Sequence, residues 1–189
     1  MTKINNEAAK PDNGVNVEAL LGAREALDTT PAAAKFVWRT ETRWLHGTHS
    51  QTTIGGFFGL GEEQNRGKQF TVDADHPEQF AAANMGATPV ELALSGLASC
   101  LIAGIASVAQ HRGIQLNTVT ATIEGDMDLQ GIMGIDADVR NGFEAIRVAF
   151  QIDADANTED LKALVAQSQK RSAVFDMITN PTNVFVEVN

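Results

Sequence analysis

The strongest constraint on the fold is a charge-free segment, residues 92–109, with helix-boundary signals on both sides of it. An N-cap, an N1 proline and a capping-box glutamate precede it in the expected order, at Thr88, Pro89 and Glu91. Gly113, directly after two basic residues, is typical of a helix C-terminus. These signals predict one helix over 89–112, which is about 36 Å long at 1.5 Å per residue.

The same segment meets the lower length limit for a membrane span, so its composition has to distinguish a membrane from a protein core. It is rich in Ala, Ser and Gly rather than in Leu and Phe, and the sequence shows no second such segment. A helix that is apolar on all sides in a soluble protein is a buried central helix. The net charge of -10, from 14 Lys+Arg and 24 Asp+Glu, also argues against nucleic acid or an anionic membrane as a partner. We therefore expect a soluble protein with a central helix, and neither nucleic acid nor a membrane as its partner.

The remaining patterns predict one α+β domain behind an N-terminal extension. Residues 1–35 form the extension, with a polar, mobile tail over 1–14 and a short amphipathic helix over 15–27. Residues 36–189 form the domain, and its strand-like patterns lie at 36–42, 51–58, 69–72, 118–124, 127–129, 145–152 and 184–188. A second helix is predicted from Thr158 to the stop signal Asn180-Pro181. We therefore expect two helices packed against antiparallel sheet.

The chain has one cysteine, Cys100, which lies midway along the predicted central helix. A single cysteine excludes an internal disulfide and a cysteine cluster for metal. Gly96 and Gly104 share its face of the helix and form a groove that another element can approach closely. Cys100 is then either a small buried apolar residue or a reactive thiol, and a reactive thiol needs a cation or a hydrogen-bond donor nearby. The polar N-terminus lacks the apolar core of a signal peptide, so we expect a location in the reducing cytoplasm.

No pattern in the sequence predicts a metal or another cofactor. His46 and His49 would point to opposite faces of one strand, and no third ligand cluster accompanies them. His76 lies in a predicted turn, and His111 in the last turn of the central helix, where the helix dipole stabilises its charged form. No phosphate loop, nucleophile elbow or dinucleotide-binding glycine motif is present.

Two segments in the correct order resemble the OsmC/Ohr superfamily. The sequence A-T-P-V-E-L at 87–92 with G-L-A-S-C-L at 96–101 resembles its central-helix signature, and R-S-A-V-F-D-M at 171–177 followed by T-N-P resembles its second helix. Residues 140–148 are similar to a longer subgroup. The resemblance covers about residues 36–188 and leaves the first 35 unexplained. It implies an OsmC-like fold, with antiparallel sheets wrapped around two central helices in an intertwined homodimer.

The resemblance also assigns roles to single residues. Cys100 matches the peroxidatic cysteine of the peroxidase branches, whereas the position of their second, resolving cysteine holds Ser172. Their catalytic glutamate directly follows the proline, where this chain has Val90, and Glu91 is displaced by one residue, about 100° around the helix. Their activating arginine comes from an early loop, for which the candidates are Arg39, Arg43 and Arg66. The candidate catalytic residues are therefore Cys100, Glu91 and Ser172.

These residues leave three hypotheses for function. The first is a thiol protein that reduces organic hydroperoxides through Cys100 alone, with an external thiol as reductant. The second is a non-enzymatic protein of the same fold that binds a small apolar or acyl ligand at the dimer interface. The third is a stress-related dimer without a ligand. An activated Cys100 favours the first hypothesis, and an inert one favours the second. The resemblance also predicts that Ser172 lies beside Cys100.

Overall fold

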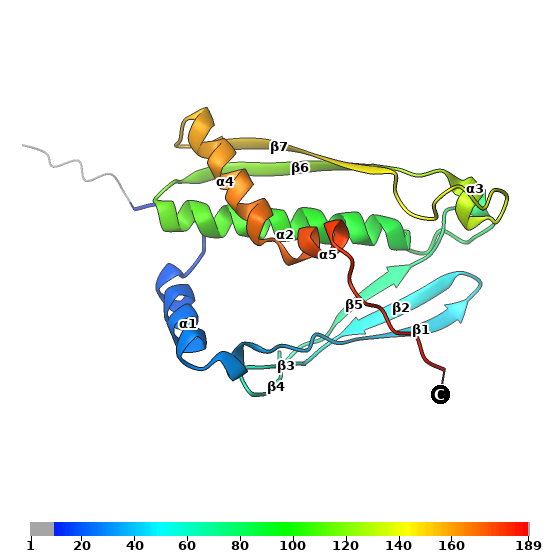
Figure 1. The fold of residues 1–189 in the computed structure, drawn as a ribbon, viewed down its shortest axis with the longest axis horizontal. Helices are drawn as coiled ribbons and strands as arrows, with labels where there is room; N and C mark the ends of the chain where they lie inside the picture. The colour runs from blue at the N-terminus through cyan, green and yellow to red at the C-terminus, as the bar shows by residue number, and fades with distance from the viewer. Residues whose placement is uncertain (1–9, 189) are drawn as a thin grey trace, which may run out of the picture. The chain divides into compact units, whose positions relative to one another are not determined.

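The computed structural model describes residues 10–188 (Figure 1). This part of the chain forms two compact units, one made of residues 10–17 and 94–188 and the other of residues 18–93. We refer to the first as the C-terminal unit and to the second as the N-terminal unit. The predicted division into an extension and one domain of 36–189 stays a prediction. Of the predicted polar tail, residues 1–9 lie outside the described residues.

The N-terminal unit contains one helix and two small antiparallel sheets. Helix α1 spans Val17–Thr29, followed by a 3-10 turn at Pro31–Ala34. Strands β1 (Thr40–His46), β2 (His49–Ile54) and β5 (Phe70–Ala74) form a sheet in the order β1-β2-β5, and β3 (Phe57–Gly59) pairs with β4 (Glu62–Gln64). A second 3-10 turn, Glu78–Phe80, lies between β5 and the central helix.

Three sequence predictions for this unit need correction. The strand predicted over 51–58 is two strands, because Gly55 and Gly56 separate β2 from β3. The strand predicted to begin at residue 36 begins at Thr40. His46 and His49 do not share a strand but are opposite partners across a hairpin, whose turn includes Gly47 at a φ of 57°. A left-handed backbone suits glycine, which has no Cβ to clash.

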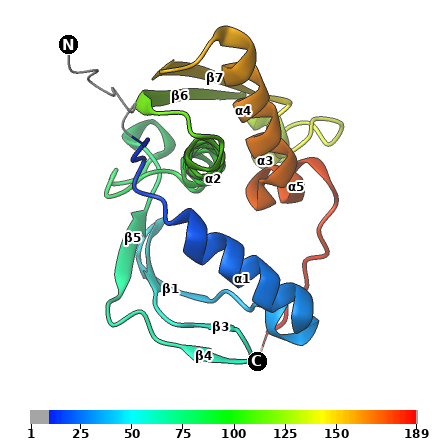
Figure 2. The ribbon, with the colours of Figure 1, turned by 90° about the vertical axis from the view of Figure 1, so that its left-hand side faces the viewer.

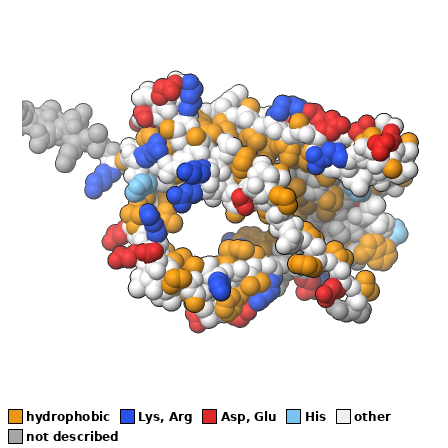
Figure 3. Space-filling view, in the orientation of Figure 1, with side chains coloured by type: hydrophobic (Ala, Val, Ile, Leu, Met, Phe, Trp, Pro, Cys, Tyr) orange, Lys and Arg blue, Asp and Glu red, His pale blue; other side chains and the backbone are white. Residues whose placement is uncertain are grey.

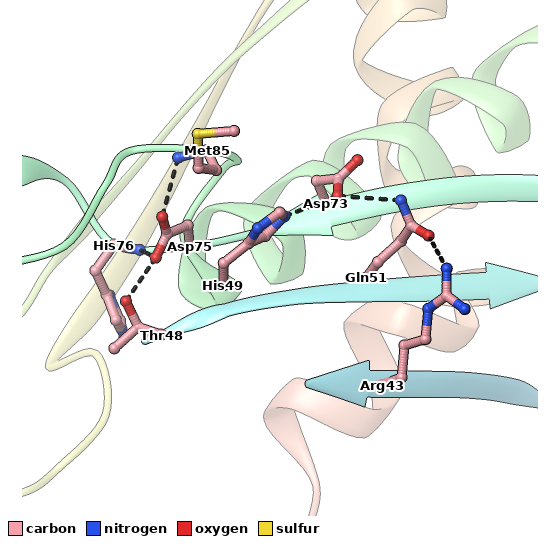
Figure 4. Close-up of polar contacts among 8 residues, drawn as sticks. All are labelled: Arg43, Thr48, His49, Gln51, Asp73, Asp75, His76 and Met85. Carbon is pink, nitrogen blue, oxygen red and sulfur yellow. Dashed lines mark hydrogen bonds and ion pairs between the residues drawn. The ribbon is translucent and has the colours of Figure 1, made fainter. Parts of the chain in front are cut away.

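A buried carboxylate holds the segment that leads to the central helix (Figure 4). Asp75 is 1% exposed and accepts hydrogen bonds from Thr48 Oγ1 at 2.5 Å, from His76 N–H at 2.8 Å and from Met85 N–H at 3.0 Å. The Thr48 hydroxyl and the two backbone donors favour the charged form, so the pKa of Asp75 falls to about 2. Because Met85 lies ten residues after Asp75, these bonds close the loop before the helix cap.

A row of polar side-chain contacts crosses the β1-β2-β5 sheet (Figure 4). Arg43 donates to Gln51 at 3.0 Å, and the Gln51 amide donates to Asp73 at 3.3 Å. His49 Nε2 lies 2.9 Å from the same Asp73 oxygen. The row therefore joins β1, β2 and β5 through side chains in addition to the backbone ladder.

The C-terminal unit consists of helix α2, a long hairpin and three shorter helices. Helix α2 spans Pro89–Arg112, the predicted bounds, and its first residues belong to the other unit. Strand β6 (Leu116–Asp126) pairs antiparallel with β7 (Ala145–Ala154), with α3 (Leu129–Ile132) between them. Helices α4 (Thr158–Arg171) and α5 (Ala173–Thr179) follow. Figure 2 looks along α2 and shows the hairpin on one side of it and α4–α5 on another.

Helix α2 buries one stripe of side chains, not its whole surface. The buried residues recur every four positions along the helix: Leu97, Leu101, Ile105 and Ala109. Among the described residues, α2 is the one helix long and apolar enough to cross a membrane, and 22% of its apolar window is buried. One such helix is weak evidence for a membrane span, because the core helix of a soluble protein meets the same criteria.

Four further predictions for this unit differ from the structure. Residues 127–129 form no strand, and Leu129 begins α3. The second helix is not continuous but breaks at Ser172, which has an extended backbone with ψ 116°. Residues 184–188 form no strand among the described residues, since no neighbouring strand pairs with them and Phe185 is 86% exposed. The described part of the tail that was predicted to be mobile, residues 10–14, is held in place by Asn13. Its side-chain Nδ2 donates to Ile114 O at 2.8 Å, and its Oδ1 accepts a hydrogen bond from Leu116 N–H at 2.9 Å.

Candidate functional site

Helix α2 and helix α4 approach closely at one glycine. A Cβ atom added at Gly104 would lie 2.2 Å from Ser168 Oγ and 3.0 Å from Ser168 Cβ. The Ser168 hydroxyl donates to the Leu101 carbonyl oxygen at 2.6 Å, so its position is set by α2 itself. Since only glycine leaves room for this contact, the absence of a side chain at position 104 determines how near α4 lies to α2.

Cys100, one turn before Gly104 on α2, meets Ser172, which lies one turn after Ser168 and directly follows the last residue of α4. The Ser172 hydroxyl donates to Cys100 Sγ at 3.1 Å and accepts a hydrogen bond from Phe175 N–H, also at 3.1 Å. Ser172 is 5% exposed, whereas Cys100 is half-buried. The predicted proximity of these two residues is therefore confirmed, and they lie in the same unit of the structure.

The break in the second helix directs backbone donors at the sulfur. Ser172 is the N-cap of α5, so the first N–H groups of that helix have no partner within it. Burial raises the pKa of the Cys100 thiol, but hydrogen bonds from the Ser172 hydroxyl and from the N–H groups of Val174 and Ala173 outweigh it. The pKa of Cys100 therefore lies below its ordinary value, as expected for a thiolate that accepts several hydrogen bonds.

A cavity of about 320 Å³ is lined by residues three positions from each member of this pair, although neither Cys100 nor Ser172 itself lines it. Its inner wall contains Leu97, which precedes Cys100 on α2, and Phe175, which bonds to Ser172 through its N–H. Its remaining lining comes from the segment before β7, from β7 and from α5: Arg140, Phe143, Glu144, Ala145, Ile146, Val148, Ile178 and Thr179. The volume falls within the range of about 300–1,000 Å³ that is usual for small-molecule sites.

Glu91, the third candidate catalytic residue, makes capping contacts. The Thr88 N–H and hydroxyl both donate to Glu91 Oε2 at 2.8 Å, and Glu91 N–H donates back to Thr88 Oγ1 at 3.3 Å. The Thr88 N–H is the main cause that lowers the pKa of Glu91. Nine residues of helix place Glu91 about 13 Å from Cys100 along the axis. Its capping role is confirmed, and a role in thiol chemistry stays a prediction.

The three candidate arginines all belong to the N-terminal unit and have partners there. Arg39 forms a two-bond contact with Glu63, at 2.7 Å and 2.9 Å. Arg43 donates to Gln51, and the guanidinium of Arg66 lies 5.4 Å from the Phe57 ring centre. Activation of the thiol by any of them stays a prediction.

Sequence reasoning missed the backbone donors of α5 and the charged residues of the cavity. A signal for the first was present, because basic Lys170 and Arg171 precede a serine, which is the pattern of a helix end followed by an N-cap. In the sequence, Arg140 stands out only as part of residues 140–148, which are similar to a longer subgroup. Within residues 10–188, no three His, Cys, Asp or Glu side chains converge as metal ligands.

Ser172→Ala is expected to raise the pKa of Cys100, because it removes the hydroxyl donor from the sulfur. The pH midpoint of iodoacetamide alkylation should move upwards, and the rate at pH 7 should fall severalfold. Ser168→Ala is the matched control, since it removes a buried hydroxyl four residues earlier, one that donates to the Leu101 carbonyl oxygen instead of Cys100. An unchanged midpoint in Ser172→Ala, or an equal shift in both variants, would contradict the assigned role of Ser172.

Comparisons with known proteins are consistent with this geometry. A family model described as "OsmC-like protein" matches residues 82–187, which include Cys100 and Ser172. No curated protein matches the sequence at a significant level.

Several solved structures share the fold. An OsmC-like protein from Mycoplasma pneumoniae has a TM-score of 0.58 at 17% identity, covering 76% of this chain and 88% of that one. An organic hydroperoxide resistance protein OsmC from Legionella pneumophila has a TM-score of 0.51 at 20% identity, covering 75% and 89%. An OsmC-like protein of unknown function from Vibrio cholerae has a TM-score of 0.52 at 10% identity, covering 74% and 91%. These similarities confirm the predicted α+β fold with antiparallel sheets.

Proposed function

Because the chain belongs to the OsmC family, whose model matches more than half of it, we propose that it is a thiol-dependent redox protein that reduces organic hydroperoxides at Cys100. The observation that carries the proposal is the hydrogen bond of 3.1 Å from the Ser172 hydroxyl to Cys100 Sγ, and the pKa of Cys100 is lowered by this bond and by the N–H groups of Val174 and Ala173. Donors of this kind stabilise a thiolate, which is the nucleophilic form of cysteine. The Legionella protein of similar fold is described as conferring organic hydroperoxide resistance, which agrees with this substrate class.

The proposed reaction uses one cysteine. The Cys100 thiolate attacks the terminal oxygen of the hydroperoxide, an S–O bond forms, the O–O bond breaks, and the alkoxide leaves as an alcohol after it takes up a proton. Cys100 is then a sulfenic acid. An external thiol condenses with it to a mixed disulfide and water, and a second external thiol restores Cys100 and leaves as a disulfide. The chain has no second cysteine to replace these external thiols.

In this reaction, Ser172 holds the Cys100 sulfur in place through the hydrogen bond that its hydroxyl donates. The N–H groups at the start of α5 stabilise negative charge on the sulfur, and later on the oxygen that the sulfur takes from the hydroperoxide. The serine cannot condense with a sulfenic acid as a thiol does. Turnover therefore depends on small reducing thiols, which favours a reducing compartment such as the cytoplasm.

The test is hydroperoxide consumption with and without dithiothreitol. Without the reductant, we expect a burst of about one equivalent of alcohol per Cys100 and then no turnover, because the sulfenic acid is not resolved. With dithiothreitol, consumption should continue. Cys100→Ser should remain folded, by circular dichroism, and show neither phase. If no burst is seen and Cys100 also fails to react with iodoacetamide, the proposed hydroperoxide reduction by this protein is excluded.

A binding protein without redox activity is the second candidate. The cavity of about 320 Å³ favours it, because its walls are mainly apolar and adjoin the central helix. An inert Cys100 with retained binding of a small apolar ligand is the result that would select this candidate. A reactive Cys100 with the burst described above would select the peroxidase.

We also propose that the protein acts as a homodimer. Within the described chain, apolar side chains at the end of the sequence are uncovered, with Val184 79% and Phe185 86% exposed. Hydrophobic side chains also reach the surface of the C-terminal unit between α4 and the hairpin (Figure 3). A second copy that covers such surfaces gains about 25 cal/mol per Å² of buried apolar area. Light scattering at micromolar concentration should give twice the chain mass, and a stable folded monomer would contradict the dimer.

A further inference from the structure

We propose that the Asn141-Gly142 pair is a site of spontaneous deamidation, at which the guanidinium of Arg140 assists attack by the Gly142 nitrogen on the Asn141 side chain. The inference goes beyond the proposed function, because it involves neither Cys100 nor a peroxide. The pair lies in the segment between α3 and β7, and the reaction turns a neutral amide there into a carboxylate.

The sequence contains two Asn-Gly pairs, Asn13-Gly14 and Asn141-Gly142. A glycine after asparagine favours deamidation, because without a Cβ its backbone adopts more conformations and its nitrogen reaches the preceding side chain with less steric hindrance. As sequences, the two pairs are therefore equally reactive. Their surroundings in the structure differ, and that difference makes one of them the site.

Asn13 is held by hydrogen bonds that oppose the reaction. It is half-buried, its Nδ2 donates to Ile114 O at 2.8 Å, and its Oδ1 accepts from Leu116 N–H at 2.9 Å. The N–H of Gly14, whose nitrogen is the nucleophile in this pair, donates to Asp12 Oδ1 at 3.0 Å. These bonds have to open before the Gly14 nitrogen can reach the Asn13 side chain.

Asn141 and Gly142 lack such restraints. Asn141 is exposed, and the two residues lie in a bend outside the helices and strands. Within residues 10–188, neither the Asn141 side chain nor the Gly142 N–H forms a hydrogen bond. The amide carbon is thus open to attack, and the attacking nitrogen has no hydrogen bond to break first.

Arg140 lies against the reacting backbone. A Cβ atom added at Gly142 would be 3.4 Å from a terminal guanidinium nitrogen of Arg140. This guanidinium has no ion pair with any carboxylate of the described chain. A guanidinium is always charged, so it stabilises the negative charge that develops on the Gly142 nitrogen as its proton leaves, and on the oxygen of the tetrahedral intermediate.

The reaction needs no partner other than water. The Gly142 nitrogen loses its proton and forms a C–N bond to the side-chain carbonyl carbon of Asn141, the C–NH₂ bond breaks, and ammonia leaves. Water then opens the cyclic succinimide at either carbonyl, which gives aspartate or isoaspartate. In sum, an amide and water become a carboxylate and ammonium, with no change of oxidation state. Because the reacting groups belong to adjacent residues, the attack is intramolecular.

The product changes the charge of the segment that precedes β7. The new carboxylate follows Arg140 directly in the chain and gives its guanidinium an anionic partner. Since Arg140 and Phe143 are among the residues that line the cavity described above, the modification alters the charge of its lining segment as the protein ages.

The test is incubation of the folded protein in mildly alkaline buffer, followed by rapid digestion and mass spectrometry to measure conversion at each asparagine. We expect Asn141 to convert at least about tenfold faster than Asn13, because several hydrogen bonds have to open at Asn13. In urea, where those bonds are absent, the two rates should become similar. Gly142→Ala should suppress conversion at Asn141, since it adds the Cβ that glycine lacks.

Arg140→Gln tests the assistance and should slow the conversion of Asn141 severalfold. Arg140→Lys keeps the charge and should retain most of the rate, and Arg112→Gln is the control of equal charge change at a residue bonded to Gln167. An unmodified Asn141 in the folded protein, or equal conversion of Asn13 and Asn141 before unfolding, would overturn the proposed site. Equal losses in Arg140→Lys and Arg140→Gln, or no loss in either, would overturn the assistance by Arg140. Neither result bears on the hydroperoxide burst, which decides the proposed function separately.

Discussion

Ser172→Cys is expected to change Cys100 from a lone thiol into one half of an internal disulfide. Cys100 Sγ and Ser172 Oγ lie 3.1 Å apart and point towards each other. A disulfide needs a bond of about 2.05 Å, so a small local movement of the two helices is sufficient. The introduced thiol would attack the Cys100 sulfenic acid, form the S–S bond and release water.

The result is a change in stoichiometry that thiol counting can measure. The reduced variant should show two free thiols, and one equivalent of hydroperoxide should reduce that number to zero, with a mass lower by two hydrogens. Each further turnover should then require a reductant that cleaves the disulfide between Cys100 and the introduced cysteine, whereas the unchanged protein requires a thiol that reduces the Cys100 sulfenic acid. Ser168→Cys is the matched control, because the Ser168 hydroxyl donates to Leu101 O and not to Cys100. Its added thiol should remain free after the same treatment. Two free thiols in oxidised Ser172→Cys would contradict the packing described above.

Gly104→Ala is expected to destabilise the protein, although alanine is the better helix former. The added Cβ would lie 2.2 Å from Ser168 Oγ, so α4 has to move away from α2. Overpacking of this kind costs about 1–3 kcal/mol. Gly96→Ala is the matched control in the same helix, because an added Cβ at Gly96 meets no described atom within 4 Å. That variant should gain up to about 1 kcal/mol from helix propensity.

Urea unfolding at one fixed protein concentration measures the difference between the two variants. Because both gain the same propensity, the gap of about 1–3 kcal/mol reports the steric contact with Ser168. Iodoacetamide alkylation of Cys100 should also slow in Gly104→Ala, since movement of α4 carries Ser172 away from the sulfur. Adding Ser168→Gly should recover part of the loss. A Gly104→Ala protein as stable as Gly96→Ala would show that the helices do not approach as described.

The sequence predicted those elements whose ends depend on neighbouring residues. The bounds of α2 follow from the cap at Thr88 and the glycine at 113, and both act within one turn of the helix. The start of α4 near Thr158 was predicted from the acidic residues of its first turn, Glu159 and Asp160, and the structure adds Asn157 as its N-cap. The lone cysteine, and with it the need for an external thiol, is a property of composition alone.

Tertiary structure decided the features that depend on residues far apart in the chain. A serine inside an amphipathic pattern can lie within a helix or begin a new one. Ser172 begins a new helix, and its hydroxyl donates a hydrogen bond to Cys100 Sγ, 72 residues away in the sequence. The close approach at Gly104 and the cavity that joins Arg140 to Phe175 likewise require the packed helices. The sequence alone therefore determined that Cys100 lies on a long helix without a second cysteine. Only the packing of α4 and α5 against that helix decided which donors reach the sulfur, because those contacts form between segments that no local pattern relates.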